Sequence, residues 1–159
     1  MPIKKQVLVA FVAGFVLFAA AGVAQAATTM TPSESSLLRA MNRARAAYGL
    51  GPLHRDATLE RAARAYSTEM LRTGVFSHGS FFSRVRSFGA RGPQLGENLA
   101  WGVGAYANAS NIVRQWLASP SHRANLLRPG YTRVGIGARR GAFQGRAGTL
   151  VITADFGGR

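Results

Sequence analysis

Two histidines and one glutamate are the residues of this sequence best suited to metal or proton chemistry. His78 stands in Phe-Ser-His-Gly, His122 in Ser-Pro-Ser-His-Arg, and Glu97 in Gly-Glu-Asn-Leu-Ala. Two imidazoles and a carboxylate suit Zn²⁺ or another divalent first-row metal and leave positions open for water or a ligand. The three lie far apart in the chain and form no local pair such as HExxH. They therefore also fit a structural network in which a buried Glu97 accepts hydrogen bonds from imidazole and backbone donors.

The composition disfavours or excludes several other kinds of active site. The sequence has no cysteine, which removes disulfides, thiolate zinc sites, iron–sulfur clusters and cysteine nucleophiles. A glycosidase needs two facing carboxylates, and a serine triad would need Asp56 or Asp155 to reach a histidine beside an activated serine. Nothing in the spacing supports either mechanism. His54, which follows Pro52 and Leu53, is interpreted as an ordinary loop histidine.

The first residues of the chain predict export. Lys4 and Lys5 precede an apolar run from Val7 to Val23, and Ala24-Gln25-Ala26 supplies the small-x-small pattern of a cleavage site. We expect residues 1–26 to be a signal peptide and the mature protein to be extracellular or periplasmic. The alternative is that the apolar run stays uncleaved as a membrane anchor.

The charge balance bears on partners. Twenty basic residues against six acidic ones give a formal net charge of +14 over 159 residues. The arginines are scattered, so no basic arm for a nucleic-acid groove is indicated and no specific nucleic-acid binding is expected. Diffuse positive charge favours screened attraction to anionic cell-envelope polymers or lipids. The length suits one domain with its own core, and we expect a monomer.

Two helices are predicted at the start of the mature chain. Thr31-Pro32-Ser33-Glu34 is typical of a capped helix start, and the helix that follows is expected to end near Tyr48. Asp56 is expected to cap a second helix that carries an apolar stripe from Leu59 to Met70 and stops at Gly74. We expect these two helices to share a core.

The rest of the chain predicts loops, two more helices and a hairpin. Residues 75–96 are rich in Ser, Gly and Phe, with a short helix expected over 83–88. A third long helix is expected to start at Asn108 or Ser110 and to be disrupted by Pro120. Alternating apolar residues after Val134 and after Leu150 predict two strands joined by a Gly-rich loop over 140–148. The fold class is therefore α+β, with helices packed against a small antiparallel sheet.

Four phrases, taken together in this order, resemble the bacterial branch of the CAP superfamily, which groups cysteine-rich secretory proteins, antigen 5 and plant pathogenesis-related proteins. They are Phe76-Ser77-His78, Gly96-Glu97-Asn98-Leu99-Ala100, the run from Trp116 to Leu127, and Tyr131-Thr132-Arg133-Val134-Gly135-Ile136-Gly137. The resemblance implies a secreted SCP-like domain with a three-layer α-β-α sandwich. It also implies a central cleft lined by two histidines and two acids that can hold zinc or another divalent ion. We place this domain at 37–159, after a short lead-in at 27–36.

The family's four site positions are only partly matched. His78 matches the first histidine and Glu97 the acid of the Gly-Glu-Asn motif. The second acid would fall at Ser119, and the second histidine of eukaryotic members would fall at Gly130. His122 belongs instead to the phrase that resembles the bacterial branch. Because one carboxylate is missing, the resemblance implies a weaker metal site at His78, Glu97 and His122.

Three functions remain open at this point. A secreted binding module would hold a metal, a small molecule or a lipid without turning it over, with Phe76, Phe81 and Phe82 as apolar neighbours. A metal-assisted hydrolase would use Glu97 as general base, but a Glu97 that ligates the metal is not free to act as the base. The third function is attachment to the cell envelope by charge. We assign no catalytic residue other than Glu97 in the hydrolytic case, and the sequence favours the absence of enzyme activity without deciding it.

Several of these residues also have a purely structural interpretation. The phenylalanines are expected to be buried in the core. Ser119 is expected to cap or hydrogen-bond within the turn before His122. Asn98 and Asn125 are expected to tie loop backbone, and Trp116 to be a core residue. The structure decides these points.

Overall fold

The computed structural model describes residues 29–158, so the signal peptide expected over 1–26 lies outside the described residues. Within the described range no helix is both long and apolar enough to cross a membrane. The elements follow the order α1 (Pro32–Ala47), β1 (His54–Arg55), α2 (Ala57–Thr73), α3 (Phe81–Ser87), β2 (Leu95–Gly102), the 3-10 helix η1 (Gly104–Ala107), α4 (Ala109–Ala118), α5 (Pro120–Leu126), β3 (Tyr131–Phe143) and β4 (Arg146–Gly158).

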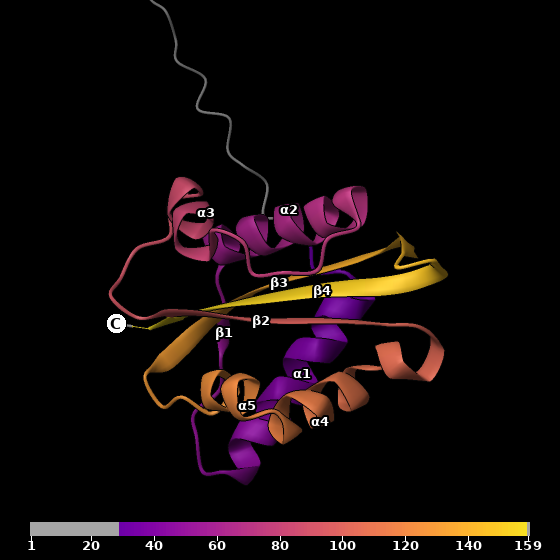
Figure 1. Cartoon of the computed structure of the whole chain (residues 1–159). Helices are drawn as coiled ribbons and strands as arrows, with labels where there is room; N and C mark the ends of the chain where they lie inside the picture. Colours follow the sequence, from indigo (N-terminus) through magenta and orange to yellow (C-terminus); the bar gives the residue numbers. More distant parts are fainter. Residues whose placement is uncertain (1–28, 159) are drawn as a thin grey trace, which may run out of the picture.

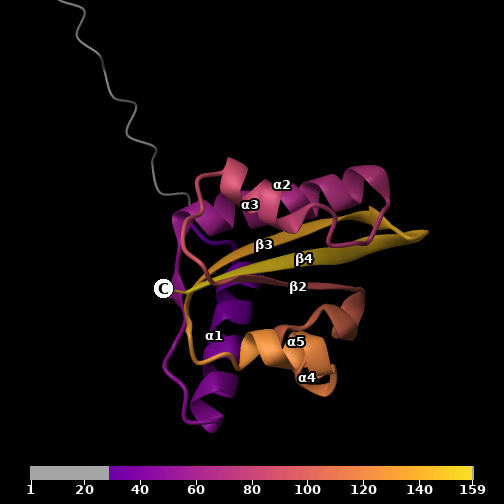
Figure 2. The same ribbon diagram turned by 60° about the vertical axis from the view of Figure 1, so that its left-hand side comes forward.

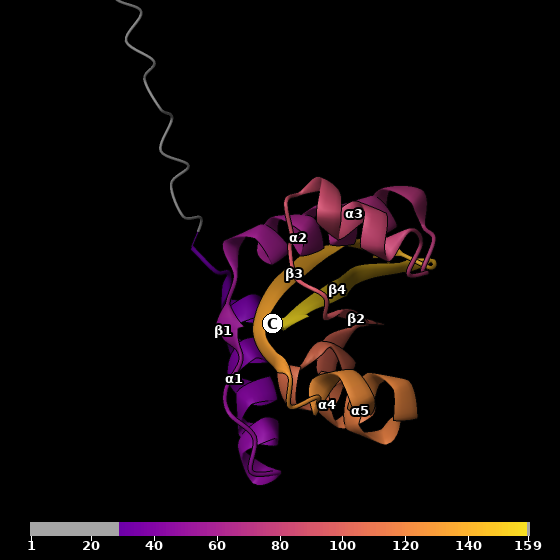
Figure 3. The same cartoon turned by 90° about the vertical axis from the view of Figure 1, so that its left-hand side faces the viewer.

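These elements form three layers (Figure 1). The sheet has the strand order β1-β3-β4-β2, with antiparallel pairing of β3, β4 and β2 and a short parallel pairing of β1 to β3. Helices α2 and α3 cover one face, whereas α1, α4 and α5 cover the other, as the views in Figures 1 and 3 show. The α-β-α sandwich that the resemblance implied is confirmed.

The first helix begins as its sequence predicts. Thr31 and Glu34 form a capping box, in which each side chain binds the backbone N–H of the other residue, and Pro32 occupies the first turn. Leu37 and Met41 then join Ile112 and Trp116 of α4 in the main core, on one side of the sheet. This face of α1 therefore packs on α4 rather than on α2.

The second helix lies on the opposite face of the sheet, so the expectation that α1 and α2 share a core is wrong. Leu59 and Ala62 of α2 pack with Val85 of α3 in a separate cluster. Two glycines of β3 bring α2 close to the sheet, because a Cβ at Gly135 or Gly137 would overlap the backbone of α2. The Gly-x-Gly phrase is thus the surface of β3 on which α2 packs. Helix α2 ends as predicted at Gly74, whose φ of 70° is left-handed.

The C-terminal hairpin is longer than its sequence suggested. Strand β3 continues to Phe143 and strand β4 begins at Arg146, whereas a Gly-rich loop was expected over 140–148. The turn is made by Gln144 and Gly145, which both have positive φ. Two such residues match the right-handed twist of the flanking strands, so the ladder continues to the tip.

Strand β2 was not predicted, although it carries the Gly-Glu-Asn-Leu-Ala phrase. It is an edge strand, and α4 and α5 lie beneath it in Figure 2. Its outward carbonyls are covered by side chains: Asn125 donates to Glu97 O at 3.0 Å, and Trp116 Nε1 donates to Leu99 O at 3.0 Å. Trp116 is thereby confirmed as a core residue, while Asn125 ties the backbone of strand β2 rather than that of a loop. Both contacts explain how a polar edge stays buried.

Candidate functional site

The three sequence candidates come from different parts of the fold and gather at β2. Glu97 lies on β2, His78 in the loop between α2 and α3, and His122 on α5 in the opposite helix layer. His78 Nδ1 is 2.7 Å from Glu97 Oε1. His122 lies near enough for the charge of His78 to lower the pKa of His122, although burial lowers it more. The structure therefore brings His78 and Glu97 into contact, while His122 contacts Ser119 and Asn98, the residue that follows Glu97 on β2.

His122 is oriented by its own turn and by β2. Its Nδ1 lies 2.9 Å from Ser119 Oγ, and its carbonyl accepts a hydrogen bond from Asn98 Nδ2 at 2.9 Å. Ser119 precedes Pro120 at the start of α5, and its hydroxyl makes no hydrogen bond to the helix backbone. Of the two structural roles expected for Ser119, the hydrogen bond within the turn is confirmed and the cap is not.

Arg84 is the site residue that the sequence analysis missed. Its Nη2 pairs with Glu97 Oε2, and its Nη1 donates to the carbonyl of His78 at 3.1 Å. The guanidinium also stacks on Tyr66 of α2, with its Cζ atom 3.4 Å from the ring centroid. Arg84 stands on a short helix among other arginines, and its partner lies on another element. No local sequence signal distinguishes it.

Asp155 is a second carboxyl group beneath Glu97. It faces Glu97 across the β2–β4 ladder and is fully buried. Its two oxygens have no hydrogen-bond donor in the described part of the chain. A carboxyl pair of this kind is stabilised when one proton lies between the two groups. Sequence alternation put Asp155 on a strand, but the register that sets it opposite Glu97 could not be predicted.

The pKa values of this pair follow from burial. Burial raises the pKa of Glu97 to about 7, although Arg84 opposes the shift. Burial and the neighbouring Glu97 charge raise the pKa of Asp155 well above its ordinary value. At neutral pH the pair therefore retains a proton, and we assign it to Asp155 because Glu97 has the charged partner Arg84. Burial and the Arg84 charge lower the pKa of His78, which keeps this imidazole neutral.

Two pockets open along β2 beside these residues. The first, which we call the His78 pocket, has a volume of about 530 Å³ and is lined by His78, Gly79, Ser80, Phe81, Phe82, Ser83, Leu95, Gly96 and Glu97. The second, the His122 pocket, has a volume of about 290 Å³ and is lined by Phe76, Leu99, Ala100, Trp101, Gln115, Trp116, Ser119 and His122. Each pocket combines aromatic walls with an imidazole.

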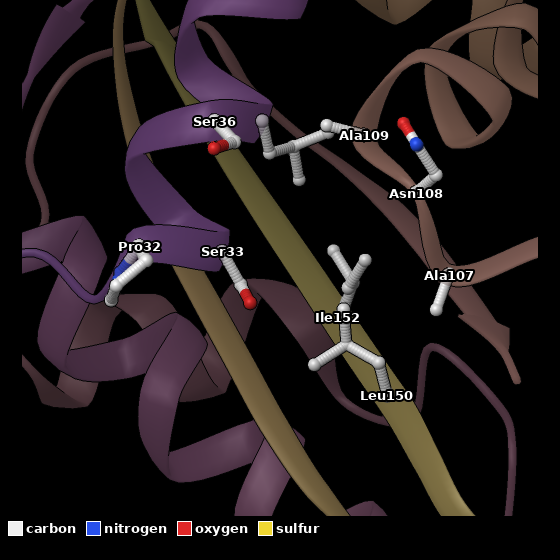
Figure 4. Close-up of a pocket in the computed structure, with 9 residues that line it drawn as sticks. Pro32, Ser33, Ser36, Ala107, Asn108, Ala109, Leu150 and Ile152 are labelled. Carbon is white, nitrogen blue, oxygen red and sulfur yellow. The ribbon is translucent and has the colours of Figure 1, made fainter. Parts of the chain in front are cut away.

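A separate pocket lies between the beginnings of α1 and α4, above β4 (Figure 4). Its volume is about 300 Å³, and its lining comprises small, apolar and uncharged polar side chains, including Ser33, Ser36, Asn108 and Ile152. None of the candidate site residues lines it. His78, Glu97 and His122 therefore belong to the two pockets on β2, whereas Arg84 and Tyr66 line a further pocket of about 580 Å³.

The arrangement around Glu97 does not fit a bound metal ion. Both of its carboxylate oxygens are engaged, one by His78 and the other by Arg84. Among residues 29–158, no group of three or more His, Cys, Asp or Glu side chains is placed to hold a metal ion. A metal bound by Glu97 would lie close to the Arg84 guanidinium, whose positive charge repels it. The expected metal site stays a prediction without support from this geometry.

The sandwich, with His78 and Glu97 meeting at its edge strand, defines the class of the domain as CAP-like. The sequence profile of the cysteine-rich secretory protein family matches residues 38–156. The chain belongs to this family, although it contains no cysteine.

Known proteins from bacteria and plants resemble the chain in sequence. It is 36% identical to Bacillus subtilis YkwD over 120 residues, which cover 69% of this chain and 46% of that protein. Pathogenesis-related protein 1C of Nicotiana tabacum is 32% identical over 95 residues, or 58% of this chain and 48% of that protein. The chain therefore spans about half the length of these two relatives.

Solved structures share the fold. An outer surface protein of Borrelia burgdorferi aligns with a TM-score of 0.67 and 23% identity, over 83% of this chain and 96% of that one. An extracellular SCP-domain protein of Bacillus anthracis aligns with a TM-score of 0.65 and 22% identity, over 83% of this chain and 45% of that one. Both structural neighbours are thus described as outer-surface or extracellular proteins.

Proposed function

We propose that this chain is a secreted, non-catalytic binding domain that holds a small amphipathic ligand of the lipid or sterol class. The ligand's apolar body would lie in the His78 and His122 pockets, and its polar end would meet an imidazole. The observation that carries this proposal is the exposure of two aromatic side chains: Phe76 is 40% and Phe82 57% exposed. The core burial expected for these two residues is wrong, while Phe81 is partly buried against the α2–α3 cluster.

The position of the exposed phenylalanines supports a role in binding. Phe82 lines the His78 pocket, and Phe76 lines the His122 pocket. A large aromatic side chain that stays exposed to water carries a free-energy cost, which an apolar ligand removes by covering it, so exposed rings beside a pocket favour an apolar ligand. The imidazole of His78, whose side chain is 56% exposed, offers the polar contact.

The bonds of Glu97 argue against hydrolysis. A general base must reach a water molecule, but the Glu97 side chain is only 2% exposed and its two oxygens already contact His78 and Arg84. Asp155 is fully buried and cannot reach a substrate. Cleavage of a peptide, lipid or wall glycan by the parent, lost in Glu97→Gln, would contradict the non-catalytic proposal.

The direct experiment is uptake of a fluorescent fatty acid or a fluorescent sterol by delipidated, refolded protein. We expect saturable binding by the parent, weakened about tenfold in Phe82→Ser because one aromatic contact contributes on the order of 1.5 kcal/mol. Phe76→Ser should act in the same direction. Tyr106→Ser is the matched control, since Tyr106 is 70% exposed and lines neither pocket. The absence of saturable uptake by the parent would end the proposal.

Attachment to anionic envelope polymers is a second candidate, favoured by unpaired surface arginines. Arg43, Arg86, Arg114 and Arg146 are exposed and form no ion pair within the described residues. They lie on α1, α3, α4 and β4, so the charge is spread over the surface rather than gathered in one patch. Binding to anionic vesicles or wall polymer should disappear between low and moderate salt. Salt-independent binding would contradict this mode of attachment.

A further inference from the structure

The residues expected to hold a metal have a cationic neighbour in direct contact. Arg84 Nη2 pairs with Oε2 of Glu97, while Oε1 of Glu97 lies 2.7 Å from His78 Nδ1. Each carboxylate oxygen therefore already has one partner, as does one of the two imidazole nitrogens of His78. A divalent ion approaching Glu97 would meet the charge of the guanidinium, and like charges at such separations repel strongly in a partly buried site.

Arg84 is held in this position from several sides. Its guanidinium stacks on Tyr66, lies 5.6 Å from the centroid of the Phe81 ring, and donates to the carbonyl of His78. Only 13% of the side chain is exposed. A flexible surface arginine that pairs with a carboxylate would lack these contacts. The position of Arg84 is therefore fixed by the packing of the fold.

The support for Arg84 extends to the loop that carries His78. The hydroxyl of Tyr66 donates to the carbonyl of Ser77 at 2.5 Å. Gly79 makes room for this ring, because a Cβ at Gly79 would lie 2.8 Å from the Tyr66 hydroxyl. The Phe-Ser-His-Gly phrase therefore fits around the Tyr66–Arg84 stack as well as presenting His78.

A positive charge has a physical reason to be here. Glu97 and the fully buried Asp155 place two carboxyl groups side by side in the sheet. Buried carboxylates require an opposite charge or a proton nearby. We infer that Arg84 supplies the positive charge of this cluster and determines its specificity. Arg84 occupies the side of Glu97 that a divalent metal would need, and it thereby excludes metal ions from His78, Glu97 and His122. The ligand selected by such a site is a neutral or organic molecule rather than a metal ion.

The test is titration of Zn²⁺ into the full mature domain, followed by calorimetry, with Co²⁺ absorption as a second readout of coordination. Arg84→Met keeps an apolar side chain of similar length over Tyr66 but removes the charge. We expect Zn²⁺ affinity to rise about tenfold or more in this variant. Arg86→Met is the matched control, because Arg86 is an exposed arginine of the same helix and makes no contact with Glu97. It should bind Zn²⁺ as the parent does.

A second variant keeps the inference testable if Arg84→Met does not fold. Glu97→Gln in the parent background should leave the weak Zn²⁺ affinity unchanged within about twofold, because Glu97 is not available as a ligand while Arg84 holds it. In the Arg84→Met background the same change should abolish the gain. Parent binding as tight as that of Arg84→Met, or a tenfold loss in Glu97→Gln alone, would overturn the inference. Neither outcome depends on whether the pockets take up lipid.

Discussion

Two buried glutamates show how differently this fold treats the same side chain. Glu34, at the start of α1, accepts hydrogen bonds from Arg64 at 2.6 Å and from the backbone N–H groups of Thr31 and Ala138. Glu97, on β2, is held by Arg84 and His78 and lies against the carboxyl of Asp155. Both side chains are almost inaccessible to solvent. Their surroundings differ in one respect: Arg64 lies between Glu34 and the next acid, Glu60, whereas Glu97 faces another carboxyl group directly.

The difference appears in their pKa values. Burial alone would raise both, but the bonds to Arg64, Thr31 and Ala138 hold the pKa of Glu34 below its ordinary value. For Glu97 burial dominates and raises the pKa to about 7. Glu34 is therefore a fixed charge that joins α1, α2 and β3. Glu97 belongs to a carboxyl pair whose charge changes near neutral pH, and perturbed pKa values of this kind are frequent at functional sites.

The largest expected effect comes from breaking the Glu34 network. Glu34→Gln keeps the shape but removes the charge that Arg64 and Arg139 approach, so the free energy of unfolding should fall by about 3 kcal/mol. Urea denaturation at pH 7 measures this. A loss too small to resolve would mean that the buried ion pair contributes nothing beyond its hydrogen-bonding geometry.

An intermediate effect is expected in the pH dependence of stability. The lowered pKa of Glu34 gives stability that is present above the ordinary value of 4.5 and is lost as pH falls through the folded value. The raised pKa values of Glu97 and Asp155 act in the opposite sense: their contribution is present at acid pH and is lost as pH rises through the folded pKa of each group, which for Glu97 is about 7.

Asp155→Asn should therefore flatten the neutral side of the stability curve. Its free energy of unfolding should exceed that of the parent by on the order of 1 kcal/mol at pH 8 and by little at pH 4, because a buried amide cannot ionise beside Glu97. Thermal unfolding measured from pH 4 to pH 8 follows the acid side and the neutral side of the stability curve. Glu34→Gln is the comparison, because it alters the acid side. Equal curves for the parent and Asp155→Asn would contradict the shared proton.

The smallest effect is expected at an exposed pair of the same chemistry. Glu69 and Arg72 on α2 pair at 2.7 Å, but their side chains are 47% and 69% exposed. Such pairs are screened by solvent, so Arg72→Met should not shift the unfolding midpoint measurably. A shift comparable to that of Glu34→Gln would show that burial is not what separates the three glutamates.

The sequence predicts the local parts of this fold well. The capping box at Thr31, the Asp56 cap and the stop at Gly74 depend on residues within a few positions of one another, and all three are confirmed. The break at Pro120 is likewise local and separates α4 from α5. These features need no knowledge of tertiary contacts.

What the sequence could not provide depends on contacts between distant segments. The sheet face on which α2 docks is set by Gly135 and Gly137, which lie far along the chain. Arg84 and Asp155 join Glu97 only through a helix–strand contact and a strand register. The sequence predicts His78, Glu97 and His122 as site residues because of their residue types and the family resemblance. Their neighbours carried no such signal.

The most direct test of the account is to locate a bound ligand by nuclear magnetic resonance. A fatty acid or sterol titrated into ¹⁵N-labelled, delipidated protein should shift the backbone amide signals of His78, Glu97 and His122, beside the two pockets on β2. The account predicts that these signals move together and that those of Ser33 and Ala109, at the pocket in Figure 4, stay in place. Shifts confined to Ser33 and Ala109 would contradict it.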